Sequence, residues 1–255
     1  MNVRAAIFDL DGTLLDTIED LTDSMNAALS ALGFPALTIT ECKSLVGDGL
    51  STFIRRALPE AQRDNPDSGR RLLEAMRAEY RLRCAVKTRP YPGIPEMLDE
   101  LAARNIPLAV LSNKPHASTL TIIAHYFPQT VFRAVFGARE SVPIKPDPAG
   151  ALEIAALLAV PPGEVLYLGD TNTDMQTATA AGMFPVGAAW GFRTAAELWA
   201  SGAKALAARP EDVLNWFPRN GQGTSLRLAT RPWLVSTGKY GGSRPPGKAR
   251  GPGRR

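Results

Sequence analysis

Short apolar runs alternate with stretches of helical period along most of the chain. These runs are rich in β-branched residues and end in polar ones; they occupy residues 5–11, 106–113, 134–138, 164–170 and 184–189. Between them, residues 95–103 and 149–158 place apolar side chains at spacings of three and four, which predicts helices. Alternating strands and helices predict an α/β fold, with a doubly wound parallel sheet covered by helices on both faces.

One segment interrupts this alternation. From about residue 17 to residue 91 the pattern is helical, with almost no strand signal. Residues 18–32 carry one apolar stripe that Gly33 can end, and residues 72–80 carry a second. We therefore expect residues 17–91 to form an inserted α-helical cap domain over the strand ends, and residues 1–16 and 92–218 to form the α/β core.

The C-terminal segment 219–255 differs from the rest in charge and composition. It holds nine of the 29 Lys and Arg residues and none of the 25 Asp and Glu residues, so the first 218 residues carry 20 basic and 25 acidic side chains, a net charge of −5. The formal net charge of +4 therefore comes from this tail. The tail is rich in Gly, Pro and Arg with little to bury, which predicts disorder.

Such a tail leaves two further interpretations open. Its positive charges could neutralise phosphates and give weak, salt-sensitive nucleic-acid binding, although the acidic body opposes this and no nucleic-acid reading module accompanies it. The tail could equally be the product of a shifted reading frame with no role. Nucleic-acid binding is therefore not the main function that we expect.

The N-terminal residues do not read as a signal peptide, because Asp9, Asp11 and Asp16 interrupt any apolar region. No apolar run approaches the roughly 20 residues that span a bilayer, so no membrane association is expected. The two cysteines, Cys42 and Cys84, do not imply a disulfide framework. These features predict a cytoplasmic protein.

Polar residues follow three of the predicted strands. Asp9 and Asp11 end the first, Ser112 and Asn113 the second, and Asp170 a later one. In doubly wound sheets ligands bind outside the carboxyl ends of the strands. Two carboxylates two residues apart on a strand face the same way, and they resist burial together unless a cation or a shared proton accompanies them.

Each of the later polar pieces is ambiguous alone. Ser112 and Asn113 could bind phosphate oxygens or cap a helix, and Lys145, before Pro146, could be a solvated turn residue. Asp170, with Asp174 four residues on, could simply begin a helix. Arg55 and Arg56 could meet an anionic substrate, although a solvated helix face is the favoured interpretation.

Together and in order, Asp9-Leu10-Asp11-Gly12-Thr13, Ser112-Asn113, Lys145 and Gly169-Asp170 to Asp174 resemble the motifs of the haloacid dehalogenase (HAD) superfamily of phosphatases. The resemblance covers residues 3–217, and segment 17–91 resembles that superfamily's helical cap. Three further motifs resemble the phosphoglycolate phosphatase group: Asp16-Thr17, Val46-Gly47-Asp48-Gly49 and Asn113-Lys114-Pro115.

The resemblance implies a set of roles. Asp9 would be the nucleophile that forms an aspartyl-phosphate, Asp11 the general acid and then the base, and Lys145 a counter-charge. The substrate-binding residues would be Thr13, Ser112, Asn113, Gly47 and Gly49, the two glycines in a cap loop that dips toward the substrate. The presence of Asp11 favours phosphate esters over the dehalogenating branch, whose leaving group needs no proton.

The implied cofactor is Mg²⁺, which prefers hard oxygen ligands beside a phosphate. Its ligands would be the Asp9 side chain, the Asp11 backbone carbonyl and Asp170. Asp174 would not contact the metal directly but would support the site, through a metal-bound water or by pairing with Lys145. The expected activity is a Mg²⁺-dependent phosphatase for a small phosphorylated metabolite such as phosphoglycolate. A β-phosphoglucomutase-like phosphosugar mutase and a pyrophosphatase of the same superfamily remain alternatives.

Overall fold

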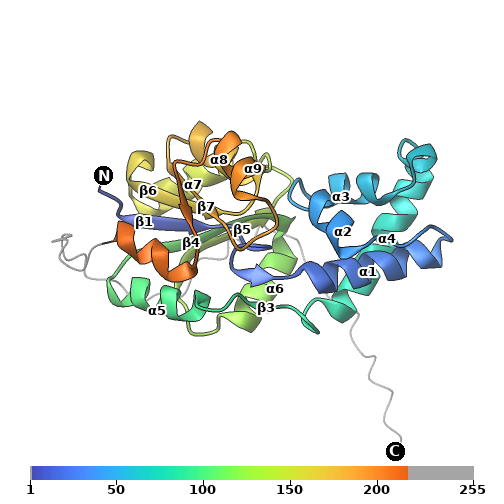
Figure 1. Cartoon of the computed structure of the whole chain (residues 1–255), viewed down its shortest axis with the longest axis horizontal. Coiled ribbons are helices and arrows are strands. Elements are labelled where there is room, and N and C mark those ends of the chain that lie inside the picture. The colour runs from blue at the N-terminus through green and yellow to red at the C-terminus, as the bar shows by residue number, and fades with distance from the viewer. Residues whose placement is uncertain (1, 218–255) are drawn as a thin grey trace, which may run out of the picture.

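The computed structural model describes residues 2–217. The chain forms an α/β core with a group of helices, α1 to α4, to one side of it (Figure 1). This confirms the predicted fold class, a parallel sheet with a helical insert. The prediction for the tail 219–255 lies outside the described residues.

The core contains a six-stranded sheet in the order β5-β4-β1-β6-β7-β8, in which every neighbouring pair is parallel. Its strands are β1 (Ala5–Phe8), β4 (Leu108–Pro115), β5 (Phe132–Ala138), β6 (Val165–Gly169), β7 (Phe184–Ala188) and β8 (Ala205–Ala207). The predicted apolar runs correspond to the first five of these. The order places β1 between β4 and β6, so the three strands that end in the predicted site residues are neighbours.

Helices cover both faces of the sheet, with α5 and α6 on one side and α7, α8 and α9 on the other (Figure 1). Their bounds are α5 (Ile94–Ala103), α6 (His116–Tyr126), α7 (Ala149–Leu158), α8 (Asn172–Ala180) and α9 (Ala195–Ala200). Alternate residues of β1 enter two different apolar clusters: Ala6 and Phe8 pack with α5 and α6, and Ala5 and Ile7 pack with α7 and α8. Burial on both faces explains why β1 reads as a continuous apolar run.

The inserted helices have an apolar core of their own, centred on Met25, Leu29, Leu72 and Met76. They are α1 (Ile18–Ala31), α2 (Ile39–Leu45), α3 (Leu50–Ala57) and α4 (Pro66–Arg83), with a short 3-10 helix η1 (Glu60–Gln62) before α4. Asn65 begins α4, because its side chain accepts hydrogen bonds from two backbone N–H groups of the first turn. We propose segment 17–91 as the cap and use that name for it below.

Two chain crossings connect the cap to the core. They are β2 (Leu15–Asp16) and β3 (Arg89–Pro90), which pair antiparallel. Next to them the buried carboxylate of Asp20 accepts hydrogen bonds from the backbone N–H groups of Val86, Lys87 and Thr88. The sequence pattern did not predict β2, β3 or β8, because runs of two or three residues carry no detectable alternation.

Two further 3-10 helices complete the core, η2 (Pro162–Glu164) and η3 (Pro210–Trp216). The second packs Val213 into the same apolar cluster as α5. Within residues 2–217 none of the helices combines the length and the apolar character that crossing a membrane requires.

Candidate active site

The first motif leaves the sheet in a tight turn after β1. The N–H groups of Thr13, Leu14 and Leu15 converge on the carbonyl of Leu10. Gly12 has φ of +91°, and a Cβ at this position would lie 2.3 Å from an oxygen of Asp170. Only glycine accepts both the backbone conformation and the close approach, so Gly12 allows the turn to pass directly over the Asp170 carboxylate.

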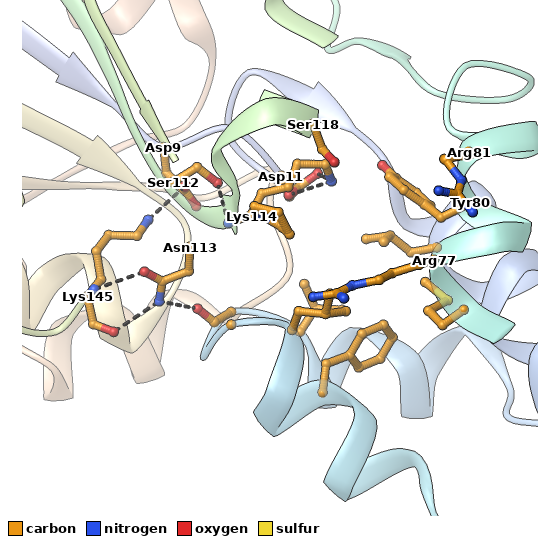
Figure 2. Close-up of a pocket in the computed structure, with 18 residues that line it drawn as sticks. Asp9, Asp11, Arg77, Tyr80, Arg81, Ser112, Asn113, Lys114, Ser118 and Lys145 are labelled. Carbon is orange, nitrogen blue, oxygen red and sulfur yellow. Dashed lines mark hydrogen bonds and ion pairs between the residues drawn. The ribbon is translucent and has the colours of Figure 1, made fainter. Parts of the chain in front are cut away.

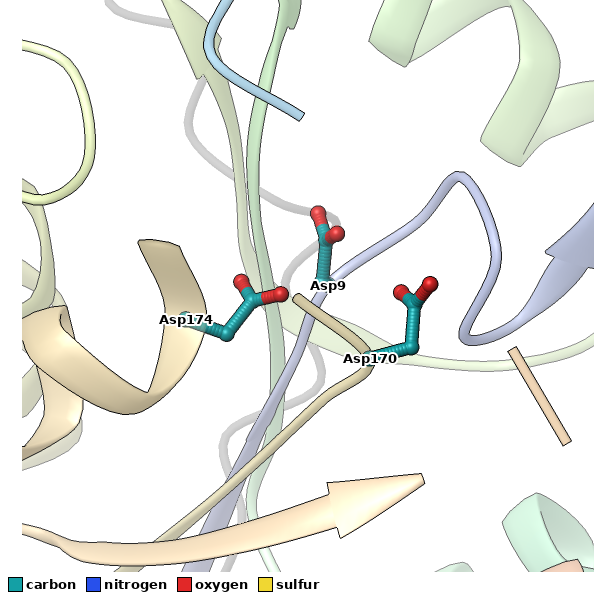
Figure 3. A group of neighbouring side chains, drawn as sticks. All are labelled: Asp9, Asp170 and Asp174. Atoms are coloured by element: carbon teal, nitrogen blue, oxygen red, sulfur yellow. The ribbon is translucent and has the colours of Figure 1, made fainter. Parts of the chain in front are cut away.

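Three aspartates from three places in the sequence meet at this end of the sheet (Figure 3). Asp9 follows β1, Asp170 follows β6, and Asp174 lies in the first turn of α8. Each offers an oxygen within 4.8 Å of the others, and all three are buried. The expected convergence at the carboxyl ends of the strands is therefore present.

Burial and mutual repulsion disfavour the ionised forms of these acids. The pKa of Asp9 is raised well above its ordinary value by burial and then by the charge of Asp174, against which Lys145 acts in the opposite direction. The pKa of Asp170 is raised to about 7, again by burial and then by Asp174. A bound cation would offset this repulsion and favour the ionised carboxylates.

Lys145 provides the positive charge within this group. Its Nζ lies 2.8 Å from Asp9 Oδ1 and 2.6 Å from Asp174 Oδ1. Burial alone would lower the pKa of Lys145, but Asp174 and Asp9 outweigh it and raise that pKa well above its ordinary value. Of the two arrangements expected for Asp174, the structure has the pairing with Lys145.

The other oxygen of Asp174 accepts hydrogen bonds from the backbone N–H and the hydroxyl of Thr171, at 3.0 and 2.7 Å. Asp170 is also held at both oxygens, by the Thr13 hydroxyl at 2.7 Å and by the Phe192 N–H at 2.8 Å. These contacts fix the orientation of both carboxylates before any ligand binds.

The donor set fits a hard divalent cation. It consists of carboxylate oxygens from Asp9, Asp170 and Asp174. Without a cation, the pKa values of Asp9 and Asp170 are raised. Such a set suits Mg²⁺, which binds through one or two carboxylates plus substrate phosphate. Asp9 and Asp170 could hold the ion, and Asp174 is engaged by Lys145.

Two predicted substrate-binding side chains have other partners in this structure. The Thr13 hydroxyl donates to Asp170. The Asn113 amide donates to the carbonyls of Gly47 and Lys145 and accepts from the Lys145 N–H, each at 2.9 Å. Asn113 thus ties β4 to the cap loop and to the Lys145 loop. Contact of either side chain with substrate stays a prediction.

A cavity of about 300 Å³ lies between the core and the cap (Figure 2). On the core side it is lined by the predicted residues Asp9, Asp11, Ser112, Asn113 and Lys145. Gly47 and Gly49 of the cap loop also line it, as expected for a loop that dips toward the site. The cap side is otherwise formed by apolar side chains of α1 and α3, by Val46 just after α2, and by one face of α4.

Lys114 is a site residue to which the sequence analysis gave no role. Its Nζ lies 2.9 and 3.0 Å from the two carboxylate oxygens of Asp11, and 4.6 Å from the ring centre of Tyr80 on α4. Burial would lower the pKa of Lys114, but the charges and hydrogen bonds of Asp11 and Tyr80 together outweigh burial and raise that pKa. A buried cation beside Asp11 was not evident from the sequence because only the fold brings the ends of β1 and β4 together.

Cap and core are joined by polar contacts around the cavity. Asp48 of the cap loop accepts a hydrogen bond from the Thr173 hydroxyl of the core at 2.8 Å. Arg193, in the loop between β7 and α9, donates to the carbonyls of Lys43, Ser44 and Val46 at the end of α2. Together with the Asn113–Gly47 bond, these contacts hold the cap over the aspartates.

The sequence of this chain is similar to a known protein family and to individual members of it. The family model described as "Haloacid dehalogenase-like hydrolase" matches residues 6–188. The chain is 31% identical over 204 residues to the phosphoglycolate phosphatase of Chromobacterium violaceum, covering 78% of this chain and 90% of the relative. It is 34% identical over 182 residues to the phosphoglycolate phosphatase of Nitrosospira multiformis, covering 71% and 80%.

A solved structure shows the same arrangement of elements. A crystal structure of a protein from Lactobacillus delbrueckii subsp. bulgaricus superposes with a TM-score of 0.79 at 31% identity, over 84% of this chain and 97% of that one. The similarity therefore includes both the sheet and the inserted helices.

Proposed function

Because the chain belongs to the haloacid dehalogenase-like hydrolase family, we propose that it is a Mg²⁺-dependent phosphatase that hydrolyses a small phosphomonoester such as 2-phosphoglycolate. The observation that carries the proposal is the position of Asp9. Its carboxylate lines the cavity, contacts Lys145 and lies beside Asp170. The relatives' names support the choice of substrate.

In the first step an oxygen of Asp9 attacks phosphorus, and the bond between phosphorus and the leaving alcohol oxygen breaks. Asp11 gives its proton to that oxygen, so that an alcohol leaves and Asp9 carries the phosphoryl group. Lys145, 2.8 Å from Asp9, offsets negative charge that gathers on the phosphoryl oxygens. Ser112 lines the same end of the cavity and can donate to an oxygen that is not transferred.

In the second step the Asp11 carboxylate takes a proton from water, and that water attacks the phosphorus of the aspartyl-phosphate. Inorganic phosphate leaves and the Asp9 carboxylate is restored. When bound, Mg²⁺ held by Asp9, Asp170 and the Asp11 carbonyl would neutralise charge on the phosphoryl group. Lys114 contacts both carboxylate oxygens of Asp11, so one oxygen can turn to the leaving oxygen or the water while the other keeps its contact with Lys114.

The test is phosphate release from a panel of esters with Mg²⁺, comparing the wild type with Asp9→Asn. The panel contains 2-phosphoglycolate, several sugar phosphates and pyrophosphate. We expect turnover that needs the metal and that falls at least about 1,000-fold in the variant. Asp99→Asn, on the exposed side of α5, is the matched control and should match the wild type.

The alternatives give different results in the same assay. A mutase would isomerise a sugar phosphate with little phosphate release, and a pyrophosphatase would turn over pyrophosphate best. A well-folded wild type that releases no phosphate from any compound contradicts the proposed function.

A further inference from the structure

Two arginines of α4, Arg77 and Arg81, line the cap side of the cavity. They are one helical turn apart, so they share a face of the helix, and that face also carries Met76 and Tyr80. Figure 2 shows Arg77 extending from α4 across the cavity and Arg81 next to Tyr80. Both side chains therefore lie opposite the catalytic end, where the leaving part of an ester would be.

Within residues 2–217 neither arginine has an ion pair or a hydrogen bond through its side chain, whereas two of the other three arginines of α4 are paired. Arg70 contacts Asp67 and Glu74, and Arg83 contacts Glu79. Arg55 and Arg56, the two arginines singled out from the sequence, do not line the cavity; they pair with Asp64 and Asp48. Arg77 and Arg81 thus line the cavity and have no partner among the described residues.

Neither of the acids that line the described cavity pairs with Arg77 or Arg81. The acids that line it are Asp9 and Asp11, and each already has a lysine, Lys145 and Lys114 respectively. The remaining acids, Asp170 and Asp174, and the phosphate with its cation also belong to the core end of the cavity. Arg77 and Arg81 line the cap side instead, where a second negative group on the substrate could meet them.

The rest of the cap side is poorly suited to a sugar. The other cap side chains that line the described cavity are Leu21, Val46, Leu50, Phe53 and Met76, together with Tyr80. None of the aliphatic or phenyl groups can hydrogen-bond to hydroxyls, whereas binding a sugar favours several amide, hydroxyl or carboxylate partners. This lining fits a short leaving group with few hydroxyls.

We infer that Arg77 and Arg81 bind a carboxylate on the leaving group, so that the enzyme selects short phosphate esters that carry a second anion; this rests on the proposed function. The planar guanidinium groups match a carboxylate through paired N–H···O bonds. The two arginines are specificity residues that leave the chemistry at Asp9 unchanged.

The experiment compares kcat/KM for 2-phosphoglycolate and ethyl phosphate, which has a methyl group in place of the carboxylate. The proteins are the wild type, Arg77→Gln, Arg81→Gln and the double variant. We expect each substitution to lower kcat/KM on phosphoglycolate about 10-fold or more, with ethyl phosphate changed no more than about 2-fold. Arg71→Gln, an exposed arginine of α4 outside the cavity, should match the wild type on both.

Four outcomes overturn the inference. Equal wild-type rates on the two esters would do so while leaving the phosphatase proposal standing, and so would equal losses on both esters in the variants. Wild-type preference for pyrophosphate over phosphoglycolate would assign the arginines to a second phosphate instead of a carboxylate. If the folded wild type hydrolyses none of these compounds, the proposed function fails and this inference fails with it.

Discussion

Lys114 forms a largely buried ion pair with Asp11, the proposed general acid. The Lys114 side chain is 5% exposed and the Asp11 side chain 13%, with both carboxylate oxygens within 3.0 Å of Nζ. A buried ion pair contributes little net stability, but removing one partner leaves the other charge without compensation. We therefore propose that Lys114 affects the reaction by holding Asp11 in position.

Substituting Lys114→Met should lower kcat on 2-phosphoglycolate about 10- to 100-fold, because Asp11 loses its two-point contact and its orientation. If Lys114 acts through Asp11, the double variant with Asp11→Asn should be no slower than Asp11→Asn alone. Lys204→Met, at an exposed lysine of the core, is the control. Full additivity of the two losses would contradict this role for Lys114.

At the scale of elements, the sequence pattern predicted those parts whose signal is local. Helix α7 and the strand run that became β6 follow from periodicity and from burial on both faces. The tie between Asp20 and residues 86–88 is different, because its partners are more than 60 positions apart and Asp20 reads only as an acid in the first turn of α1. Long-range polar contacts of this kind have no periodic signature.

This tie joins the first helix of the cap to its return strand, so Asp20→Ala should destabilise the protein. Three backbone N–H groups would lose a charged acceptor at a buried site, and we expect a loss of about 2–4 kcal/mol in the free energy of unfolding, measured by urea denaturation. Asp23→Ala is the matched control on the same helix. Asp23 pairs with Lys87 at a half-exposed position, so its loss should destabilise the protein much less than the loss of Asp20. Equal destabilisation by the two variants would contradict this role for Asp20.

At the scale of the whole molecule, the sequence predicted which residues meet but not how they are shared between core and cap. Asp9, Asp11, Ser112 and Asp170 could be placed together because parallel strands end at one edge. Asn113 and Thr13 carried the same signal, yet the fold uses them to hold Gly47 and Asp170. The contacts of Arg77, Arg81 and Lys114 depend on where the cap lies over the sheet, which no local pattern specifies.

Binding of a metal ion at the aspartate cluster would be coupled to the protonation of these acids and to folding stability. The pKa of Asp170 rises from an ordinary 3.8 to about 7 in the metal-free protein. A raised folded-state pKa means that the folded chain keeps a proton that the unfolded chain has lost. Its stabilising effect is therefore fully present below 3.8 and is lost as the pH rises through about 7. The pKa of Asp9, also raised, acts in the same direction.

We expect the metal-free protein to lose stability as the pH rises across this range, by up to about 1.4 kcal/mol per pH unit for each proton involved. Mg²⁺ at this site would bind the ionised carboxylates and compete with those protons, so we expect it to raise Tm little at about pH 5.5 and much more at about pH 8. Thermal melts with and without Mg²⁺ at both pH values measure this. At each pH the difference between the two Tm values removes the contribution of titrating groups that do not contact the metal. Asp170→Asn should remove most of the Mg²⁺-dependent shift at both pH values. An equal Mg²⁺ shift at the two pH values in the wild type would mean that the cluster is already ionised without the metal, and the cation would then have no proton to displace.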